Sequence, residues 1–352
     1  MSTDSPTSAA PVAIVIGAGL AGACAAHALA LAGHKVVVLD PAAEPATGGA
    51  SALPVGLMAL RKNAKAERAN PEAIAWDAQG MAATRALLEK LTAQGLLQQG
   101  RDWQACGTWQ LDKNTGNYDY QAEACWIKPA ALVAACLQHP NIQFAGGQTA
   151  LAICAEGAHW QVSTKNQVWR HAHTVVMAAA VDCTPLIAGL QAEHALGRII
   201  LNTCAGQVLM GDWQDADAAY LPQAELSAYN GSGHFMPAVP TAEGGAFWLS
   251  GATYVEGTRS RAAIAPDADT EDDWNRNKLR LAELLPECAP HLFARTAALR
   301  TWVGVRCTTP TRLPMVRELA PGLWLSTGFG SRGLSYAPLA AQRLVASLSA
   351  GV

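Results

Sequence analysis

Apolar residues near the start of the chain form a short run that ends at glycine. The run Val12–Ile16 is uninterrupted and rich in β-branched residues, as in a strand buried on both faces of a parallel sheet. The alanine-rich residues 23–32 come after a glycine-rich turn and predict a helix, which Gly33 ends. A second apolar run, Val36–Leu39, stops at Asp40. The pattern predicts a strand–helix–strand unit of a parallel sheet.

The turn between the first strand and the helix reads Gly17-Ala-Gly-Leu-Ala-Gly22. Gly17 permits the tight turn, Gly19 lets a pyrophosphate approach the backbone, and Gly22 lets the helix pack closely on the strand. The free N–H groups at the start of the helix attract phosphate, and Asp40 is placed to accept ribose hydroxyls. The unit predicts a bound dinucleotide but leaves NAD and FAD open.

Later apolar segments favour FAD over NAD. Three strand-like segments between residues 160 and 180 predict a small meander that returns to the main sheet. Near the other end of the chain, Leu323–Thr327 predicts a buried strand, followed by the glycine-rich residues 328–333 and a helix over about 337–348. Such a second junction can point another helix N-terminus at a flavin ring. An ordinary helix cap is the alternative interpretation.

Composition narrows the class of protein. Of 352 residues, 50% are hydrophobic and 15% are charged, which is an ordinary globular balance. No uncharged apolar stretch is long enough to span a membrane, and the first eleven residues lack the basic segment of a secretion signal, so we expect a cytoplasmic protein. Nine cysteines without a Cys-x-x-Cys pair argue against a zinc or thioredoxin-like site, and we expect no metal.

Charge gives limited support for a nucleic-acid partner. The formal net charge of −3 provides no global attraction to phosphate, so an RNA substrate would need a local basic patch. Arg61, Lys65 and Arg68 lie at helical spacing and are a candidate patch. A solvated helix face explains them equally well.

Five stretches of the chain carry a resemblance to a known family. They are Gly49-Ala-Ser51 with Gly56-Leu-Met58, Cys125-Trp-Ile-Lys-Pro-Ala-Ala-Leu132, Gly251-Ala-Thr-Tyr254 with residues 271–277, Gly304-Val-Arg306-Cys307 with Leu313-Pro-Met-Val316, and Gly330-Ser-Arg-Gly-Leu334 with Ala337-Pro-Leu339. The chain resembles the D-amino-acid oxidase and glycine oxidase superfamily of flavin amine oxidases. Within it, the chain is most similar to the FAD-dependent oxidoreductase domain of the MnmC family, which acts on 5-carboxymethylaminomethyl uridine at the tRNA wobble position.

The resemblance implies an α/β fold with two interleaved domains. A Rossmann-like FAD-binding domain of the glutathione-reductase type is expected to comprise residues 1–95, 125–205 and 301–352. A mixed-sheet α+β substrate domain, D-amino-acid oxidase-like, is expected to comprise residues 96–124 and 206–300. Within the substrate domain, residues 246–251 predict a strand. Residues 271–285 predict a helix that Thr270 caps and Pro286 ends.

FAD is implied to bind noncovalently. Cys307 invites comparison with enzymes that tether flavin through cysteine, but its spacing to Pro310 does not fit that pattern. The expected contacts with FAD come from the two glycine-rich junctions and the loops beside them. They are Gly17, Gly19, Leu20, Ala21, Gly22, Asp40, Ala50, Ser51, Gly56, Leu57, Ala179, Gly328, Gly330, Ser331, Arg332, Gly333 and Leu334.

The implied reaction is oxidation of a CH–NH group to an imine, which water hydrolyses. For the tRNA substrate the products are aminomethyl uridine and glyoxylate. A guanidinium fork suits the substrate carboxylate, so Arg306 is the first candidate for holding it and Arg332 the second. A structural ion pair is the alternative for each arginine. Tyr254 is a third candidate, as a pocket-lining hydroxyl, with simple packing as its alternative.

Two neighbouring residues receive opposite predictions. Phe235 lies where relatives tend to have a pocket tyrosine, so we expect it to make the substrate cavity more apolar. His234 beside it is expected to be solvated.

The chain departs from the family pattern at three points, which keeps a second substrate class open. It has Ala52-Leu-Pro-Val55 where the family usually has Gly-Asn-Arg-Gln, and Ala179-Ala180 where a glycine is expected. No accompanying methyltransferase domain is expected in this chain, so a separate methyltransferase could act on the product. The alternative substrate is a small secondary amine, for an oxidase of the glycine, sarcosine or D-amino-acid type. A noncatalytic redox sensor is more distant.

Overall fold

A computed structural model describes residues 11–60, 71–112, 114–191, 196–223, 225–257, 271–295 and 299–350. Its first elements are β1 (Val12–Ile16), α1 (Leu20–Leu31) and β2 (Lys35–Asp40). β1 pairs in parallel with β2, and α1 makes the connection between them. The predicted strand–helix–strand unit is therefore confirmed.

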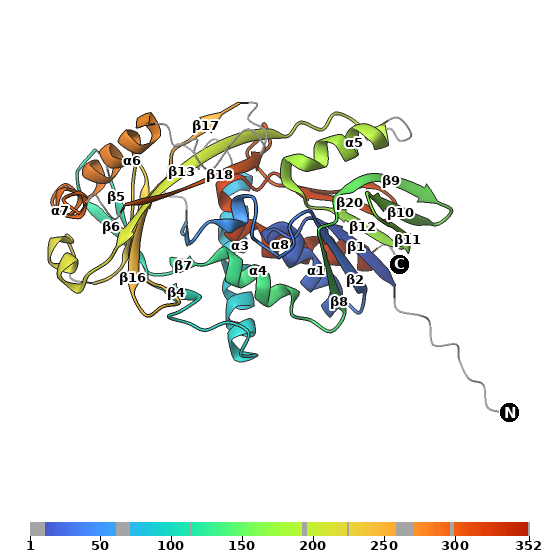
Figure 1. The fold of residues 1–352 in the computed structure, drawn as a ribbon, viewed down its shortest axis with the longest axis horizontal. Helices are drawn as coiled ribbons and strands as arrows, with labels where there is room; N and C mark the ends of the chain where they lie inside the picture. Colours follow the sequence, from blue (N-terminus) through green and yellow to red (C-terminus); the bar gives the residue numbers. More distant parts are fainter. Residues whose placement is uncertain are drawn as a thin grey trace.

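A six-stranded sheet is built around this unit. Its remaining strands are β8 (Ile142–Gly146), β12 (Thr174–Met177), β19 (Met315–Ala320) and β20 (Leu323–Thr327). The order is β19-β20-β12-β1-β2-β8, and all neighbours are parallel except the β19–β20 pair. Because β12 and β20 come from the middle and the end of the chain, distant segments complete one sheet (Figure 1).

The two faces of this sheet are covered differently. On one face, Val15 and Val176 pack against α1 and against Leu344 of α8 (Gly333–Ala350). On the other face, residues such as Met177 pack against α5 (Cys183–Gln191) and a meander. The meander consists of β9 (Ala150–Glu156), β10 (His159–Thr164) and β11 (Val168–Ala172). β10 and β11 match two of the predicted strands, the third is β12 of the main sheet, and β9 was not predicted. Each buried aliphatic side chain here contributes about 1.5–3 kcal/mol.

A small sheet connects this half to the rest of the molecule. It has the order β3-β7-β4, from β3 (Gly56–Met58), β7 (Cys125–Ile127) and β4 (Trp103–Ala105). Two helices, α3 (Pro71–Ala93) and α4 (Pro129–Leu137), flank it and pack on α8 and α1 respectively. Just after β7, Lys128 Nζ donates a hydrogen bond of 2.8 Å to the carbonyl oxygen of Pro240. This contact ties the small sheet to the large one.

The large sheet has eight strands. They are β5 (Thr108–Leu111), β6 (Tyr118–Gln121), β13 (Asn202–Asp212), β14 (Ala228–Asn230), β15 (His234–Pro240), β16 (Ala246–Gly251), β17 (Val255–Glu256) and β18 (Arg300–Thr308). The sheet is mixed, because β14 and β5 run parallel while the other pairs are antiparallel. α6 (Glu271–Leu284) and α7 (Cys288–Phe293) cover one face. The predicted strand at 246–251 and helix at 271–285 are confirmed, while Thr270 lies outside the described residues.

The domain boundaries remain a proposal that the strand pairing refines. β18 pairs with β13 along its whole length, so residues 300–308 extend the mixed sheet. From the segment 96–124, β5 and β6 also join the mixed sheet, whereas β4 joins the small one. We propose that the last FAD-binding segment begins after Thr308. Within the described ranges, no helix is long and apolar enough to cross a membrane.

Candidate flavin and substrate site

The turn after β1 is packed as tightly as its glycines predict. Gly17 has a φ of +106°, a conformation that side chains disfavour. A Cβ on Gly22 would lie 1.7 Å from the carbonyl oxygen of Gly17, so only glycine fits where α1 crosses the turn. Gly19 caps α1 without a side-chain hydrogen bond, and the first turn holds no acidic residue. The N-terminus of α1 therefore offers N–H groups and a positive dipole end to an anion.

Two side chains hold this turn in place. Asp40, at the end of β2, accepts hydrogen bonds from the N–H groups of Ala18 at 2.7 Å and Ala42 at 2.8 Å. A carboxylate has about four acceptor positions, so Asp40 retains capacity for ribose hydroxyls. Ser51 Oγ accepts a hydrogen bond of 2.9 Å from the N–H of Leu20. The predicted cofactor residues Asp40 and Ser51 thus lie directly beside the glycine turn.

The second glycine-rich junction lies against the first. Gly328 and Gly330, between β20 and α8, have φ values of +78° and +55°. A Cβ on Gly333, the first residue of α8, would lie 3.6 Å from Leu20 Cδ1. The starts of α1 and α8 are therefore neighbours, although more than 300 positions separate them in the sequence. Gly56 of β3 also lies against the start of α8, since a Cβ there would lie 2.8 Å from Leu334 Cδ1.

Alanine replaces glycine at the end of β12. A Cβ on Gly17 would lie 2.7 Å from the carbonyl oxygen of Ala178, so the backbones after β1 and β12 touch. Ala180 has a φ of +56°, which is strained for a residue with a side chain. Ala179 precedes it as the cap of a 3-10 turn, Ala180–Asp182. The predicted cofactor residues of both junctions and of the β3 and β12 segments are thus brought together. Their close backbone contacts, and the start of α1 with glycine as its N-cap and no acidic residue in its first turn, fit a dinucleotide such as FAD.

The large sheet turns one of its faces toward these segments. On β13, Leu209 packs with α6 and α7, whereas Val208 packs with Val55 beside β3. Side chains alternate between the faces of a strand. The face that carries Val208 is therefore the one toward the flavin-binding segments, and we call it the flavin face. The opposite face is the helix face.

Arg306 lies on the flavin face. On β18 it alternates with Gly304 and Trp302, and Trp302 packs with the Val208 cluster. Its Nη1 donates a hydrogen bond of 3.4 Å to the carbonyl oxygen of Thr253. A Cβ on Gly206 would lie 2.4 Å from Arg306 Nη1 and 2.6 Å from Nη2. Arg306 therefore folds into the space that Gly206 leaves, and the structure pairs it with no carboxylate among the described residues.

Tyr254 covers the guanidinium from outside. The Arg306 Cζ atom lies 4.6 Å from the centre of the Tyr254 ring, which is a cation–π contact. Tyr254 is 51% exposed. The predicted pair Arg306 and Tyr254 is thus in direct contact at the solvent edge of the flavin face.

Arg332 has a different environment. Its Nη1 donates a hydrogen bond of 2.6 Å to the carbonyl oxygen of Ala59. Its Nε lies 3.9 Å from the carboxylate of Asp77 in α3, which also accepts a hydrogen bond from Tyr336. These contacts favour the structural ion-pair interpretation of Arg332 and leave Arg306 as the better carboxylate ligand.

The predictions for His234 and Phe235 are both wrong. Phe235 is fully buried on the helix face, where it packs with Trp213 and Trp248. His234 alternates with it and so lies on the flavin face, as does Met236. Its Nε2 is buried with no hydrogen-bond partner among the described residues. Burial, and then the charge of Arg306, lower the pKa of His234 to about 4, which keeps the imidazole neutral.

Cys307 is poorly suited to covalent attachment. It is buried beside β20 and accepts a hydrogen bond of 3.6 Å from Thr327 Oγ1. Burial raises the pKa of the thiol, so it stays protonated at neutral pH. Because the thiolate is the nucleophile, this environment agrees with noncovalent FAD.

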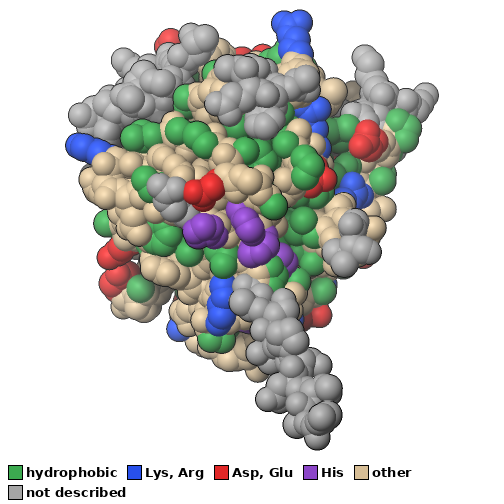
Figure 2. Space-filling model, turned by 90° about the vertical axis from the view of Figure 1, so that its right-hand side faces the viewer, with side chains coloured by type: hydrophobic (Ala, Val, Ile, Leu, Met, Phe, Trp, Pro, Cys, Tyr) green, Lys and Arg blue, Asp and Glu red, His purple; other side chains and the backbone are tan. Residues whose placement is uncertain are grey.

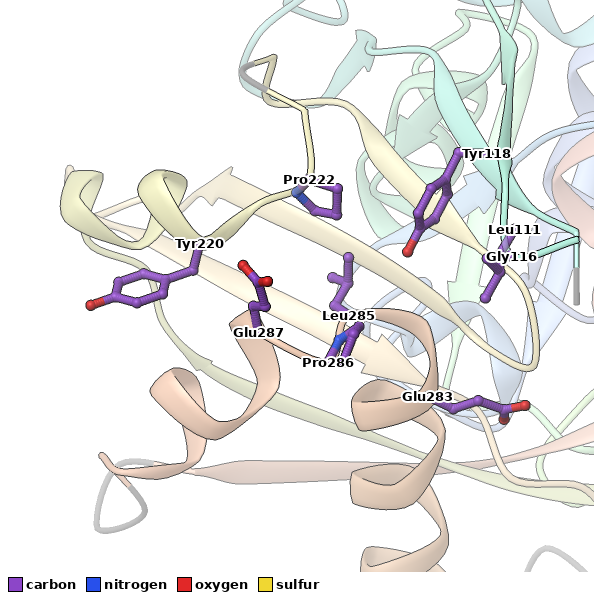
Figure 3. Close-up of a pocket in the computed structure, with 9 residues that line it drawn as sticks. All are labelled: Leu111, Gly116, Tyr118, Tyr220, Pro222, Glu283, Leu285, Pro286 and Glu287. Atoms are coloured by element: carbon purple, nitrogen blue, oxygen red, sulfur yellow. The ribbon is translucent and has the colours of Figure 1, made fainter.

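Two further features lie away from the flavin face. A cavity of about 450 Å³ opens between the β5–β6 hairpin and the α6–α7 corner, where Tyr118, Tyr220 and Glu287 line it (Figure 3). Histidines gather on another surface (Figure 2). The ring centroids of His159 and His173 lie 4.7 Å apart. Among the described residues, no group of acidic, histidine or cysteine side chains could hold a metal. The basic patch of Arg61 to Arg68 lies outside the described residues.

Two glycine-rich helix starts, facing a mixed sheet with a partly buried arginine, define a flavin-dependent oxidoreductase. The family model "FAD dependent oxidoreductase" matches residues 13–125 and 118–348. The chain belongs to this family, and FAD is its cofactor.

Curated relatives include bifunctional proteins named for tRNA 5-methylaminomethyl-2-thiouridine biosynthesis, MnmC. The protein from Polaromonas sp. is 33% identical over 380 residues, which covers 96% of this chain and 56% of the relative. The protein from Albidiferax ferrireducens is 35% identical, with 95% and 55% covered. The chain thus spans about half the length of these relatives. Since each is named as one bifunctional protein, they do not support the predicted separate methyltransferase.

Solved structures show the same fold. Glycine oxidase from Geobacillus kaustophilus aligns with a TM-score of 0.71 at 17% identity, covering 96% of this chain and 93% of the other. Iminodiacetate oxidase from Chelativorans sp. aligns with a TM-score of 0.75 at 16% identity, covering 96% and 95%. The predicted α/β architecture, with a Rossmann-like FAD domain and a mixed-sheet substrate domain, is confirmed.

Proposed function

We propose that this protein is an amine oxidase for the carboxymethylaminomethyl group of the wobble uridine in tRNA. The observation that carries the proposal is Arg306, a guanidinium on the flavin face with no carboxylate partner among the described residues. Curated relatives named for tRNA modification supply the substrate class. A tRNA substrate would place the enzyme in the cytoplasm.

The chemistry divides between the cofactor and the chain. The oxidising chemistry would come from FAD when it is bound, as the acceptor of a hydride from the carbon between the amine and the carboxylate. Arg306 binds the carboxylate and orients that carbon, and the neutral His234 can accept a hydrogen bond from the substrate amine. Water then hydrolyses the imine, which releases glyoxylate and leaves aminomethyl uridine.

The FAD contacts that we propose follow the geometry of the two junctions. The start of α1, from Gly19 to Gly22, would hold the pyrophosphate, and Asp40 would hold the ribose. The start of α8, from Gly330 to Leu334, would approach the flavin ring. Arg332 would support this junction through Ala59 and Asp77.

Nucleosides from a deletion strain test the substrate. Accumulation of the carboxymethylaminomethyl form at the wobble position is expected, and an unchanged nucleoside profile would refute a tRNA substrate. Anaerobic flavin reduction by glycine or sarcosine would instead support a small-molecule oxidase. That second candidate is favoured by the net charge of −3, which gives no general attraction to RNA.

Arg306→Met tests the carboxylate site. Loss of a charge-assisted contact of about 1.5–3 kcal/mol should lower kcat/KM by roughly 10- to 100-fold. Arg300→Met on the same strand is the control, because its ion pair with Asp212 is exposed. Turnover by Arg306→Met within a few-fold of wild type would show that Arg306 does not bind the carboxylate.

A further inference from the structure

Asn277 is a polar residue in the buried side of α6. It is fully buried, and its Nδ2 donates hydrogen bonds to the main-chain oxygen of Gln207 at 3.0 Å and to Gln207 Oε1 at 3.1 Å. Two acceptors on the same side fix the orientation of the Asn277 amide. Gln207 lies on β13 and, like Leu209, faces α6. These hydrogen bonds offset part of the free-energy cost of burying the two amides.

The Asn277 contact falls at a gap in the large sheet. β13 pairs with β17 through Cys204 and Ala205, and with β16 from Val208 onward. Between these two stretches it faces residues 252–254, which form no strand. We call these three residues the cover loop.

Hydrogen bonds to Gln207 hold the cover loop. The N–H of Gln207 donates to Thr253 Oγ1 at 3.0 Å, and the N–H of Thr253 donates to the carbonyl oxygen of Gln207 at 3.0 Å. Asn277 bonds to that same carbonyl oxygen. α6 makes a second contact, because Arg280 Nη1 donates to the carbonyl oxygen of Ala252. The position of the cover loop therefore depends on α6.

The cover loop also fixes Arg306 on the other face of the sheet. Arg306 Nη1 donates to the carbonyl oxygen of Thr253, and the ring of Tyr254 lies over the guanidinium. A continuous set of contacts therefore runs from Asn277 through Gln207 and Thr253 to Arg306. It crosses the sheet from the helix face to the flavin face.

We propose that Asn277 and Arg280 are positioning residues that hold the cover loop, so that Arg306 presents its guanidinium to a substrate carboxylate. This role rests on the proposed function of Arg306. Neither side chain is needed for the chemistry, and each acts only through the loop. Their effect should therefore be specific to ligands that carry a carboxylate.

Acetate binding to the FAD-loaded enzyme tests this role. Acetate is the probe because it carries only the carboxylate, and its binding near the flavin is followed by the flavin absorbance. Asn277→Leu keeps a similar volume and removes the donor. Arg280→Met removes the second contact between α6 and the cover loop. It takes the place of Asn277→Leu in the test if that variant does not fold. Leu281→Ala is the matched control, since Leu281 is buried on the same helix in the core of the helix face. The urea midpoint of each variant reports its stability.

We expect Asn277→Leu and Arg280→Met to raise the dissociation constant of acetate by about tenfold, the equivalent of one hydrogen bond. Leu281→Ala should lower the urea midpoint and leave acetate binding unchanged. Unchanged acetate affinity in both α6 variants would overturn the positioning role, as would an equal loss in Leu281→Ala. Arg306→Met distinguishes a failure of the positioning role from a failure of the carboxylate site. If Arg306→Met binds acetate as well as the wild type does, Arg306 is not the carboxylate site.

Discussion

Replacing Gly206 with alanine tests the position of Arg306 without touching the substrate. The new Cβ would lie 2.4 Å and 2.6 Å from the two terminal nitrogens of Arg306, and 2.6 Å from the carbonyl oxygen of Thr253. Ordinary contacts begin near 3.4 Å. The guanidinium must therefore move by about 1 Å, which is enough to spoil a bidentate contact.

The cost of Gly206→Ala follows from that contact. Losing a charge-assisted hydrogen bond of about 1.5–3 kcal/mol lowers kcat/KM by roughly 10- to 100-fold. This kcat/KM is measured with the substrate that the wild-type enzyme oxidises, either the modified tRNA or sarcosine. Overpacking should also lower the free energy of unfolding by about 1–3 kcal/mol.

Gly189→Ala is the matched control for Gly206→Ala. A Cβ on Gly189 of α5 meets nothing within 4 Å, so kcat/KM should stay at the wild-type value. Wild-type kcat/KM and unfolding midpoint in Gly206→Ala would refute the packing described for Arg306.

Three other substitutions are expected to change stability, each measured by urea unfolding. Asp217 is fully buried and accepts hydrogen bonds from His291 at 2.8 Å and Arg295 at 2.6 Å, so Asp217→Asn should cost about 2–4 kcal/mol, and a loss below 1 kcal/mol would contradict this. Ala180→Gly should stabilise by about 0.5–1 kcal/mol by relieving the φ of +56°, and destabilisation would count against that strain. The pKa of His234 is lowered to about 4 in the folded state, so the unfolded state binds its proton first as pH falls below 6.5. The free energy of unfolding should then fall by up to about 1.4 kcal/mol per pH unit down to pH 4, and His234→Gln should flatten this slope, whereas an unchanged slope would exclude the buried neutral imidazole.

Local chemistry made the flavin-binding unit predictable from the sequence. The strand at Val12–Ile16, the helix after it and the tight contact at Gly22 all follow from residues close together in the chain. The meeting of the two glycine-rich junctions is nonlocal, but the strand, glycine-rich turn and helix over residues 323–348 pointed to it, because a second helix N-terminus can approach a flavin ring. The resemblance to flavin amine oxidases pointed to Arg306 and Tyr254.

The residues that were misjudged lie where pairing over long distances decides the outcome. Alternation along β15 implies that His234 and Phe235 face opposite sides, but it does not say which side faces the flavin. A register shift between Met236 and Val239 further obscures the pattern. The sequence left Arg332 as a candidate carboxylate ligand because its partner, Asp77, is 255 positions earlier in the chain. A single sequence contains no signal for that contact.

The adjacency of α1 and α8 has a consequence for biosynthesis. The strand that completes the parallel core, β20, and the helix start beside Leu20 both come more than 300 positions after β1 and α1. Contacts of such long sequence separation form slowly, because a large loop must close first. On the ribosome, β1 and α1 therefore wait for more than 300 further residues before their partner arrives. We expect FAD capture to follow the synthesis of α8, and an interrupted chain that lacks α8 to be released without cofactor.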